Sequence, residues 1–148
     1  MQGDADKGAE TNIAALGHEW IAAWNAHDLD RVLALYTDEF EMSSKHIVAF
    51  GFDASGKLRG KSKVREYWAF ALAHVPDLHF ELIDLYTSPD SLIVFYQNER
   101  GGKVCEYLRF DASGKTRATI SRAAAAKPPT RIHSFAATRH QPRAWGEA

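Results

Sequence analysis

Apolar residues near the start of the chain recur at spacings of three and four, as on one stripe of an α-helix. They are Ile13, Leu16, Trp20 and Trp24. Residues 25–27 interrupt this spacing, and Asp28 can accept hydrogen bonds from the free amides that begin the next helix. A second, shorter apolar stripe follows, made of Leu29, Val32, Leu33 and Tyr36. The pattern predicts two helices joined by a tight corner.

The apolar period changes to two after Asp38. Phe40 and Met42 then lie on one side of the chain and Glu39 and Glu41 on the other, as in a strand with one covered face. The alternation continues over residues 43–50, which extends the predicted strand to that point.

A third helical stripe covers residues 61–74, and Pro76 prevents its continuation. Beyond it, four segments have the alternation or the continuous apolar run that is typical of strands. They are residues 78–82, 92–96, 104–110 and, as a short strand, 116–121. Helices that precede a meander of antiparallel strands, with one further helix inserted, predict an α+β fold.

The two ends of the chain differ from this middle part. Residues 1–10 are polar and rich in Gly and Ala, which predicts a disordered lead before a domain over residues 11–120. Residues 121–148 carry few large apolar side chains, so we expect a basic, disordered tail. From residue 115 onward the net charge is +6, whereas the first 114 residues carry −7.

Length and composition limit the class of protein. A chain of 148 residues with 45% hydrophobic and 25% charged residues is typical of one globular domain. No apolar run approaches the roughly 20 residues of a membrane helix, and the start lacks the features of a secretory signal. The single cysteine, Cys105, excludes an intramolecular disulfide and fits a cytoplasmic location, which we expect.

Cofactor and metal chemistry have no support in the sequence. The seven His are scattered, there is no cysteine pair or HExxH motif, and no Gly-rich phosphate loop follows a predicted strand. We therefore expect no cofactor and no metal. The basic tail lacks aromatic residues interleaved on a folded surface, so nucleic-acid binding ranks last among the hypotheses.

Glu106 is the strongest candidate for site chemistry, because it shares one strand face with apolar neighbours. These neighbours are Val104, Leu108 and Phe110. A carboxyl carried inward with them is costly to ionise, which raises its pKa and suits it to donate or shuttle a proton. The alternative is a strand-edge glutamate paired with Lys or Arg. His79 and Glu81 share another strand face, for which a solvated outer orientation is the simpler interpretation.

Four segments carry a resemblance to a known family. They are W-x3-WNAHDLD-x2-LALYTDEFEM at residues 20–42, GKSKVREYW at 60–68, PDLHFEL at 76–82 and EYLRFDASGK at 106–115. In this order they resemble the opening helices, the third helix, the strand after it and the penultimate strand of the SnoaL-like members of the nuclear transport factor 2-like superfamily. Such a resemblance indicates a fold better than it indicates a reaction.

The resemblance implies a strongly curved antiparallel sheet wrapped around the N-terminal helices. This cone-shaped α+β barrel would have a pocket at its open end, and the C-terminal tail departs from the family pattern. The resemblance also implies a small apolar or aromatic organic ligand. The ligand-binding residues that it implies, beside Glu106, are Trp20, Tyr36, Met42, Ser44, Trp68, Leu108 and Phe110.

Ketosteroid isomerases share this fold. They use a Tyr on the first helix, an Asp base on the first strand and a protonated Asp on the penultimate strand. By motif, these positions hold Trp20, Ser44 and Glu106 in this sequence. A serine cannot abstract a carbon-bound proton at neutral pH, so steroid isomerisation is not expected.

Two hypotheses of function stay open. The first is a ligand-binding domain, with isomerase, cyclase or hydratase-type chemistry that uses Glu106. The second is a non-catalytic homodimerisation module with a packed core, whose dimer forms through the outer sheet face that carries Cys105, Tyr107 and Arg109. The missing base at Ser44 favours the second hypothesis, and the inward-facing Glu106 favours the first.

Overall fold

The computed structural model describes residues 2–124, which form helices packed on one face of a mixed sheet. The helices are α1 (Gln2–Asn25), α2 (Leu29–Leu33), α3 (Lys45–Ala49) and α4 (Lys61–His74). The strands are β1 (Tyr36–Ser43), β2 (Lys57–Arg59), β3 (Glu81–Ser88), β4 (Ser91–Gln97), β5 (Lys103–Phe110) and β6 (Thr116–Ala123). The predicted α+β class is confirmed.

The six strands lie in the order β2-β1-β6-β5-β4-β3. Consecutive strands from β3 to β6 pair antiparallel, as does β1 with β2, but β1 and β6 pair parallel. The sheet is therefore antiparallel as predicted, except for this one parallel pair. A parallel pair needs a long connection, and the chain between β1 and β6, which includes α4 and three strands, provides it.

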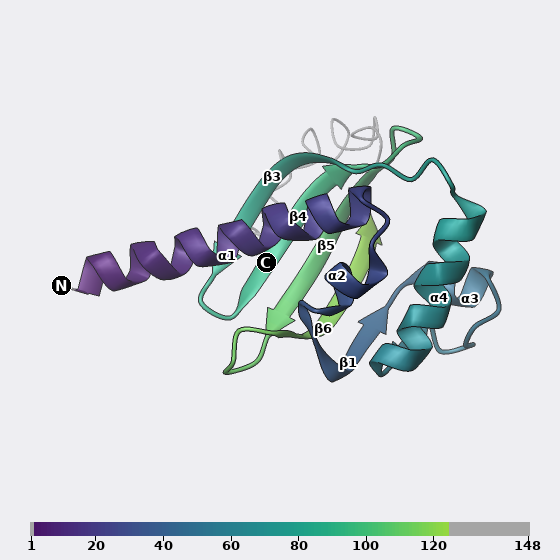
Figure 1. The fold of residues 1–148 in the computed structure, drawn as a ribbon, viewed down its shortest axis with the longest axis horizontal. Helices are drawn as coiled ribbons and strands as arrows, with labels where there is room; N and C mark the ends of the chain where they lie inside the picture. Colours follow the sequence, from purple (N-terminus) through teal and green to yellow (C-terminus); the bar gives the residue numbers. More distant parts are fainter. Residues whose placement is uncertain (1, 125–148) are drawn as a thin grey trace, which may run out of the picture.

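The helices cover only one face of this sheet. Figure 1 shows α1 running across β3 to β5, with α2 and α4 on the same side, while the first turns of α1 project beyond the sheet edge. Gly17 permits the close approach of α1 to β3, since a Cβ at this position would lie 2.6 Å from Cδ2 of Leu85. The inward-facing strand residues pack against the helices and form the core. Its fully buried members include Tyr36, Phe40, Ile47, Leu92, Val32, Val64 and Val94.

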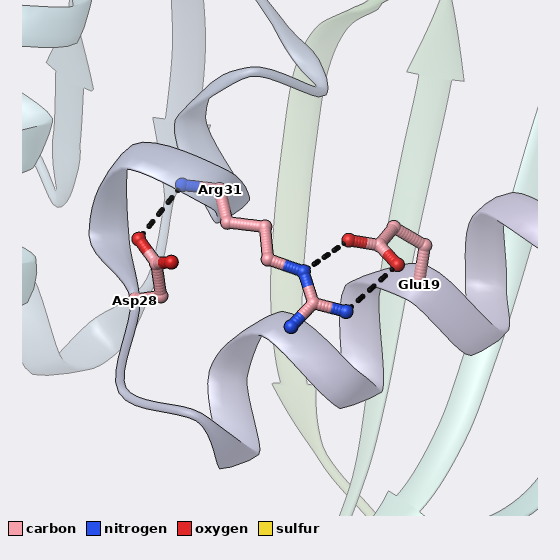
Figure 2. Close-up of polar contacts among 3 residues, drawn as sticks. All are labelled: Glu19, Asp28 and Arg31. Carbon is pink, nitrogen blue, oxygen red and sulfur yellow. Dashed lines mark hydrogen bonds and ion pairs between the residues drawn. The ribbon is translucent and has the colours of Figure 1, made fainter.

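The corner between α1 and α2 is held by polar contacts at the surface (Figure 2). Asp28 caps α2 as predicted, because its Oδ1 accepts a hydrogen bond from the Arg31 amide at 3.1 Å. The Arg31 guanidinium then reaches back to α1 and donates two hydrogen bonds to Glu19, at 2.5 and 3.0 Å. These hydrogen bonds lower the pKa of Glu19. The paired side chains link the two helices at the surface.

Residues 25–27, which follow the last turn of α1, also contact the segment that precedes β3. The left-handed residue that ends α1 is His27, with a φ of 56°, and its Nε2 lies 2.8 Å from the Leu78 carbonyl oxygen. Asn25 contacts both backbone groups of Phe80. It donates to the carbonyl at 2.9 Å and accepts from the amide at 2.7 Å. The segment before β3 is therefore held against the end of α1.

Substitution of Asn25 by alanine should destabilise the fold by about 2 kcal/mol, because it leaves two half-buried backbone groups of Phe80 without partners. Urea unfolding measures the change. Asn12→Ala is the matched control, since Asn12 lies on the same helix and is exposed. Equal stability of the two variants would show that the contacts with Phe80 contribute nothing.

Several local predictions differ from the structure. The strand predicted over residues 78–82 begins only at Glu81 and runs to Ser88 as β3. The strand predicted to continue over residues 43–50 ends at Ser43, because Ser44 caps α3 by accepting a hydrogen bond from the His46 amide at 3.2 Å. Tyr36 begins β1 rather than continuing the helical stripe. Residues 2–10, predicted as part of a disordered lead, form the beginning of α1. At the other end β6 extends to Ala123, and the predicted tail from residue 125 onward lies outside the described residues.

The described helices include none that is both long and apolar enough to cross a membrane. Within residues 2–124, His, Cys, Asp and Glu form no group of three or more that could hold a metal ion.

Candidate functional site

Two adjoining cavities open where β1, β4 and β6 end and β5 begins. The inner chamber has a volume of about 120 Å³, and the outer chamber, of about 430 Å³, lies at the surface. The two are continuous, since they share eight lining residues: Ser44, His46, Tyr67, Ala71, Leu78, Phe80, Tyr96 and Ser121. Five further residues line the inner chamber alone: Trp20, Trp24, Met42, Trp68 and Glu106. The inner chamber is a small aromatic cavity with one carboxyl, and it opens through a wide mouth.

Glu106 enters the inner chamber from β5. The alternation on this strand buries Glu106, Leu108 and Phe110 and leaves Arg109 exposed, so the predicted inward orientation is confirmed. The carboxyl is 4% exposed, and its Oε1 accepts a hydrogen bond from Thr119 Oγ1 on β6 at 2.6 Å. Burial raises the pKa of Glu106 to about 7, although the hydroxyls of Thr119 and Ser121 partly oppose the rise. Glu106 can therefore lose or gain a proton near neutral pH.

Trp20 lines the inner chamber, but its polar group is already occupied. Its Nε1 donates a hydrogen bond to the Tyr36 hydroxyl at 2.9 Å, and both side chains are buried. The Trp20 N–H is therefore not available as a donor to Glu106. The Tyr36 hydroxyl accepts this bond and lies in the core. Its pKa is raised, first by burial and then by the charge of Glu106.

Sequence reasoning missed two tyrosines that line both chambers, Tyr67 on α4 and Tyr96 on β4. Each residue is 5% exposed. The pKa of each hydroxyl is raised, mainly by burial and also by the charge of Glu106. Tyr96 lies at the end of the strand predicted over residues 92–96, but the continuous apolar run there gives no sign of which side chains face a cavity.

The structure brings together five of the eight residues predicted for the site and leaves three outside it. Trp20, Met42, Ser44, Trp68 and Glu106 line the inner chamber. Tyr36, Leu108 and Phe110 are buried in the core and line neither chamber. Leu108 and Phe110 line neither chamber because of their position along β5. They share the face of Glu106 but lie farther from the mouth, where the space between sheet and helices is filled.

The mouth of the outer chamber carries most of the charged side chains of the site. Lys45 and His46 come from α3, His74 from the end of α4, and Glu99 and Arg100 from the turn after β4. The pKa of His46 is lowered by partial burial and by the charge of Lys45. His79 and Glu81 are exposed and line neither chamber, which agrees with the solvated orientation expected for them.

The arrangement departs from that of a ketosteroid isomerase at the position of the base. Ser44 lies at the end of β1 and lines both chambers, but its Oγ caps α3. Among the described residues, Glu106 is the carboxyl that lines the inner chamber. Proton transfer in this chamber can use Glu106, and His46 is the further titratable base that lines it.

The sequence matches the profile of the SnoaL-like domain family over residues 18–120. A SnoaL-like protein of unknown function from Burkholderia thailandensis is 41% identical, with a TM-score of 0.73 over 76% of this chain and 94% of that one. No curated protein matches the chain.

More distant structures share the fold. A candidate ketosteroid isomerase from Kribbella flavida is 14% identical, with a TM-score of 0.61 over 81% of this chain and 83% of that one. A candidate polyketide cyclase from Sinorhizobium meliloti is 10% identical, with a TM-score of 0.58 over 70% of this chain and 90% of that one. These similarities concern the fold alone, and the profile match decides the family: the chain belongs to the SnoaL-like domain proteins.

Proposed function

We propose that this protein binds a small apolar or aromatic organic molecule in the paired chambers and exchanges a proton with it through Glu106. The observation that carries the proposal is a buried carboxyl at the inner end of a cavity whose other walls are mostly aromatic. Apolar cavities with few polar groups are typical of small-molecule sites. The aromatic walls favour a planar ring system, because rings pack on rings with offset or edge contacts.

The environment of Glu106 suits proton transfer. A general base works best when its pKa lies near the working pH, since it is then both ionised in part and basic. Burial raises the pKa of Glu106 to about 7 without a neighbouring cation. Thr119 donates to Oε1 of the carboxyl at 2.6 Å and so orients the group.

Isomerase-, cyclase- and hydratase-type reactions all include such a proton transfer at carbon. Structures that share the fold include a candidate ketosteroid isomerase and a candidate polyketide cyclase. Both are under 25% identical to this chain, so they support the fold and leave the reaction a proposal. The step proposed is the removal of a proton from carbon next to a carbonyl. The electrons of the broken C–H bond move into an enolate, and Glu106 later returns the proton.

Hydrogen exchange at carbon tests this step directly. In D₂O, the wild-type protein should accelerate deuterium incorporation next to the carbonyl of 1-tetralone, a fused bicyclic ketone. The rate should rise with pH through a midpoint near 7, since the ionised form of Glu106 is the base. Glu106→Gln should lower the rate by about 100-fold or more. Proton NMR of the ketone measures the exchange.

Glu81→Gln is the control, because Glu81 is exposed on β3 and lines neither chamber. It should leave the rate unchanged. If wild-type protein binds the ketone but does not accelerate exchange, the proton-transfer part of the proposal is wrong. The protein would then be a binding domain only.

The second candidate function is a homodimerisation module, with or without catalysis. The observation that favours it is the sheet face away from the helices, which carries apolar residues of intermediate exposure. They are Ile93 and Phe95 on β4, Cys105 and Tyr107 on β5 and Ile120 on β6. Strand pairing aligns Ile93, Tyr107 and Ile120 in one row across three strands. An aligned apolar row with Arg109 at its edge has the composition of an interface core and rim.

A further inference from the structure

Two tyrosines, Tyr67 and Tyr96, line both chambers, and each residue is 5% exposed. Ser44 Oγ accepts from the His46 amide, and its own O–H can donate to the Tyr67 oxygen, which lowers the pKa of Tyr67 and leaves the Tyr67 O–H to donate elsewhere. Among residues 2–124, the buried side-chain polar atom without a partner is Trp24 Nε1. The two tyrosine hydroxyls therefore reach the open space of the cavity, where a ligand can accept from them.

The two hydroxyls lie in the same chamber as the Glu106 carboxyl. Tyr96 pairs with Val104 across β4 and β5, which places Glu106 two residues further along the neighbouring strand on the same inward face. Such diagonal neighbours are about 7 to 8 Å apart at their Cα atoms. Tyr67 reaches the same chamber from α4 on the opposite wall. The charge of Glu106 acts on both phenols, and Tyr67 acts on Tyr96, as expected for three groups that surround one space.

We propose that Tyr67 and Tyr96 donate hydrogen bonds to one oxygen of the ligand and thereby hold it next to Glu106. The ligand class is a planar, uncharged organic compound with a carbonyl oxygen on or beside its ring. This inference rests on the proposed small-molecule function and adds the polar group by which the ligand is recognised.

Three properties of the site select a carbonyl. Both phenols remain protonated, so each has an O–H to donate, and a carbonyl oxygen has two lone pairs to accept them. The inner walls are aromatic and apolar, which disfavours an ionised ligand carboxylate beside the carboxyl of Glu106. A ligand without an acceptor would leave both donors unpaired, and binding sites reject such ligands strongly.

The arrangement also serves the proton transfer. When a proton leaves the carbon next to a carbonyl, negative charge develops on the carbonyl oxygen. Hydrogen bonds from two fixed donors stabilise that charge. Tyr67 and Tyr96 would then be positioning residues for binding as well as donors to the developing oxyanion, while Glu106 handles the proton.

A matched pair of ligands separates the hydroxyl contacts from apolar packing. 1-Tetralone and tetralin share a fused bicyclic skeleton and differ in one carbonyl oxygen. Wild-type protein should bind 1-tetralone about tenfold or more tightly than tetralin, measured by isothermal titration calorimetry. Tyr67→Phe and Tyr96→Phe should each weaken 1-tetralone binding by roughly three- to tenfold and leave tetralin binding unchanged. The double variant should bind both ligands with similar affinity.

Tyr86→Phe is the control, because Tyr86 is exposed on β3 and lines neither chamber. It should retain the wild-type preference. Thermal melting should show that Tyr67→Phe and Tyr96→Phe fold, since each removes only a hydroxyl that reaches the cavity. A wild-type protein that binds both ligands equally, or Phe variants that keep the preference, would overturn the assignment of the two tyrosines. Failure to bind either ligand would instead contradict the proposed small-molecule function.

Discussion

At pH 8, substitution of Glu106 by glutamine should stabilise the fold by about 3 kcal/mol. The carboxyl is fully buried, and its pKa of about 7 lies well above its ordinary value of 4.5. Each unit of pKa difference between the folded and unfolded states corresponds to about 1.4 kcal/mol. Glutamine has the size and the hydrogen-bonding groups of the protonated carboxyl, and it has no charge to bury. Its Oε1 can still accept the hydrogen bond from Thr119.

The sign of the effect follows from proton binding. Between pH 4.5 and 7 the folded protein keeps a proton on Glu106 that the unfolded chain has released. The stability of the wild-type protein therefore falls as pH rises through this window and is level above it. Glu106→Gln lacks this dependence. The two proteins should be about equally stable at pH 4, and the variant should gain over the wild type as pH rises to 7.

Urea unfolding of both proteins at pH 4, 6 and 8 measures the difference. His46 has the opposite dependence, since its pKa is lowered by burial and the unfolded chain binds its proton more readily. This contribution is common to both proteins and cancels in the difference. The exposed-site variant Glu81→Gln should follow the wild-type curve. Equal stability of wild type and Glu106→Gln at pH 8 would contradict the raised pKa.

A stabilising effect of this size at a single site has a consequence for function. Proteins retain costly buried charges where activity needs them, and stabilising substitutions at such sites commonly lower activity. Glu106→Gln should therefore separate the two open hypotheses. In a dimerisation module the substitution would raise stability without lowering activity. In a proton-transferring domain it would raise stability but remove the base.

Elements with a long, regular apolar period could be predicted from the sequence. The third predicted helix, over residues 61–74, coincides with α4, because Val64 and Trp68 mark a clear stripe and Pro76 limits its extent. The alternation on β5 correctly gave the inward orientation of Glu106. In both cases one strong local pattern decides the structure, and no distant contact opposes it.

Other features depend on contacts that no local pattern contains. Residues 43–50 alternate like a strand, yet the Ser44 cap and the packing of Ile47 in the core make α3 there. The parallel pairing of β1 with β6 is decided by chain topology. The Trp20 N–H has its partner in Tyr36, sixteen residues away, whereas the hydroxyls of Tyr67 and Tyr96 reach the chamber. Candidate site residues could thus be placed on faces, but their partners could not be named.

In the proposed homodimer, substitution of Tyr107 by glutamate should give monomers. Tyr107 lies at the centre of the apolar row on the outer sheet face, between Ile93 on β4 and Ile120 on β6. Its side chain is half-buried in the single chain, so a second copy packed on this face would bury it further. A charge placed there would be desolvated without a partner. Aromatic residues at interface centres commonly contribute 2 kcal/mol or more, which corresponds to roughly a 30-fold weaker dimer.

Light scattering coupled to size-exclusion chromatography, over a range of protein concentrations, measures this change. Ser62→Glu is the matched control, because it adds the same charge at an exposed position on α4, a helix on the opposite side of the sheet. It should leave the dimer intact. Circular dichroism should show that Tyr107→Glu stays folded, since Glu106, Leu108 and Phe110 on the other face of β5 are unchanged. If the Tyr107→Glu protein keeps the dimer mass, or if the wild-type protein is monomeric at all concentrations, this face does not join two copies of the chain.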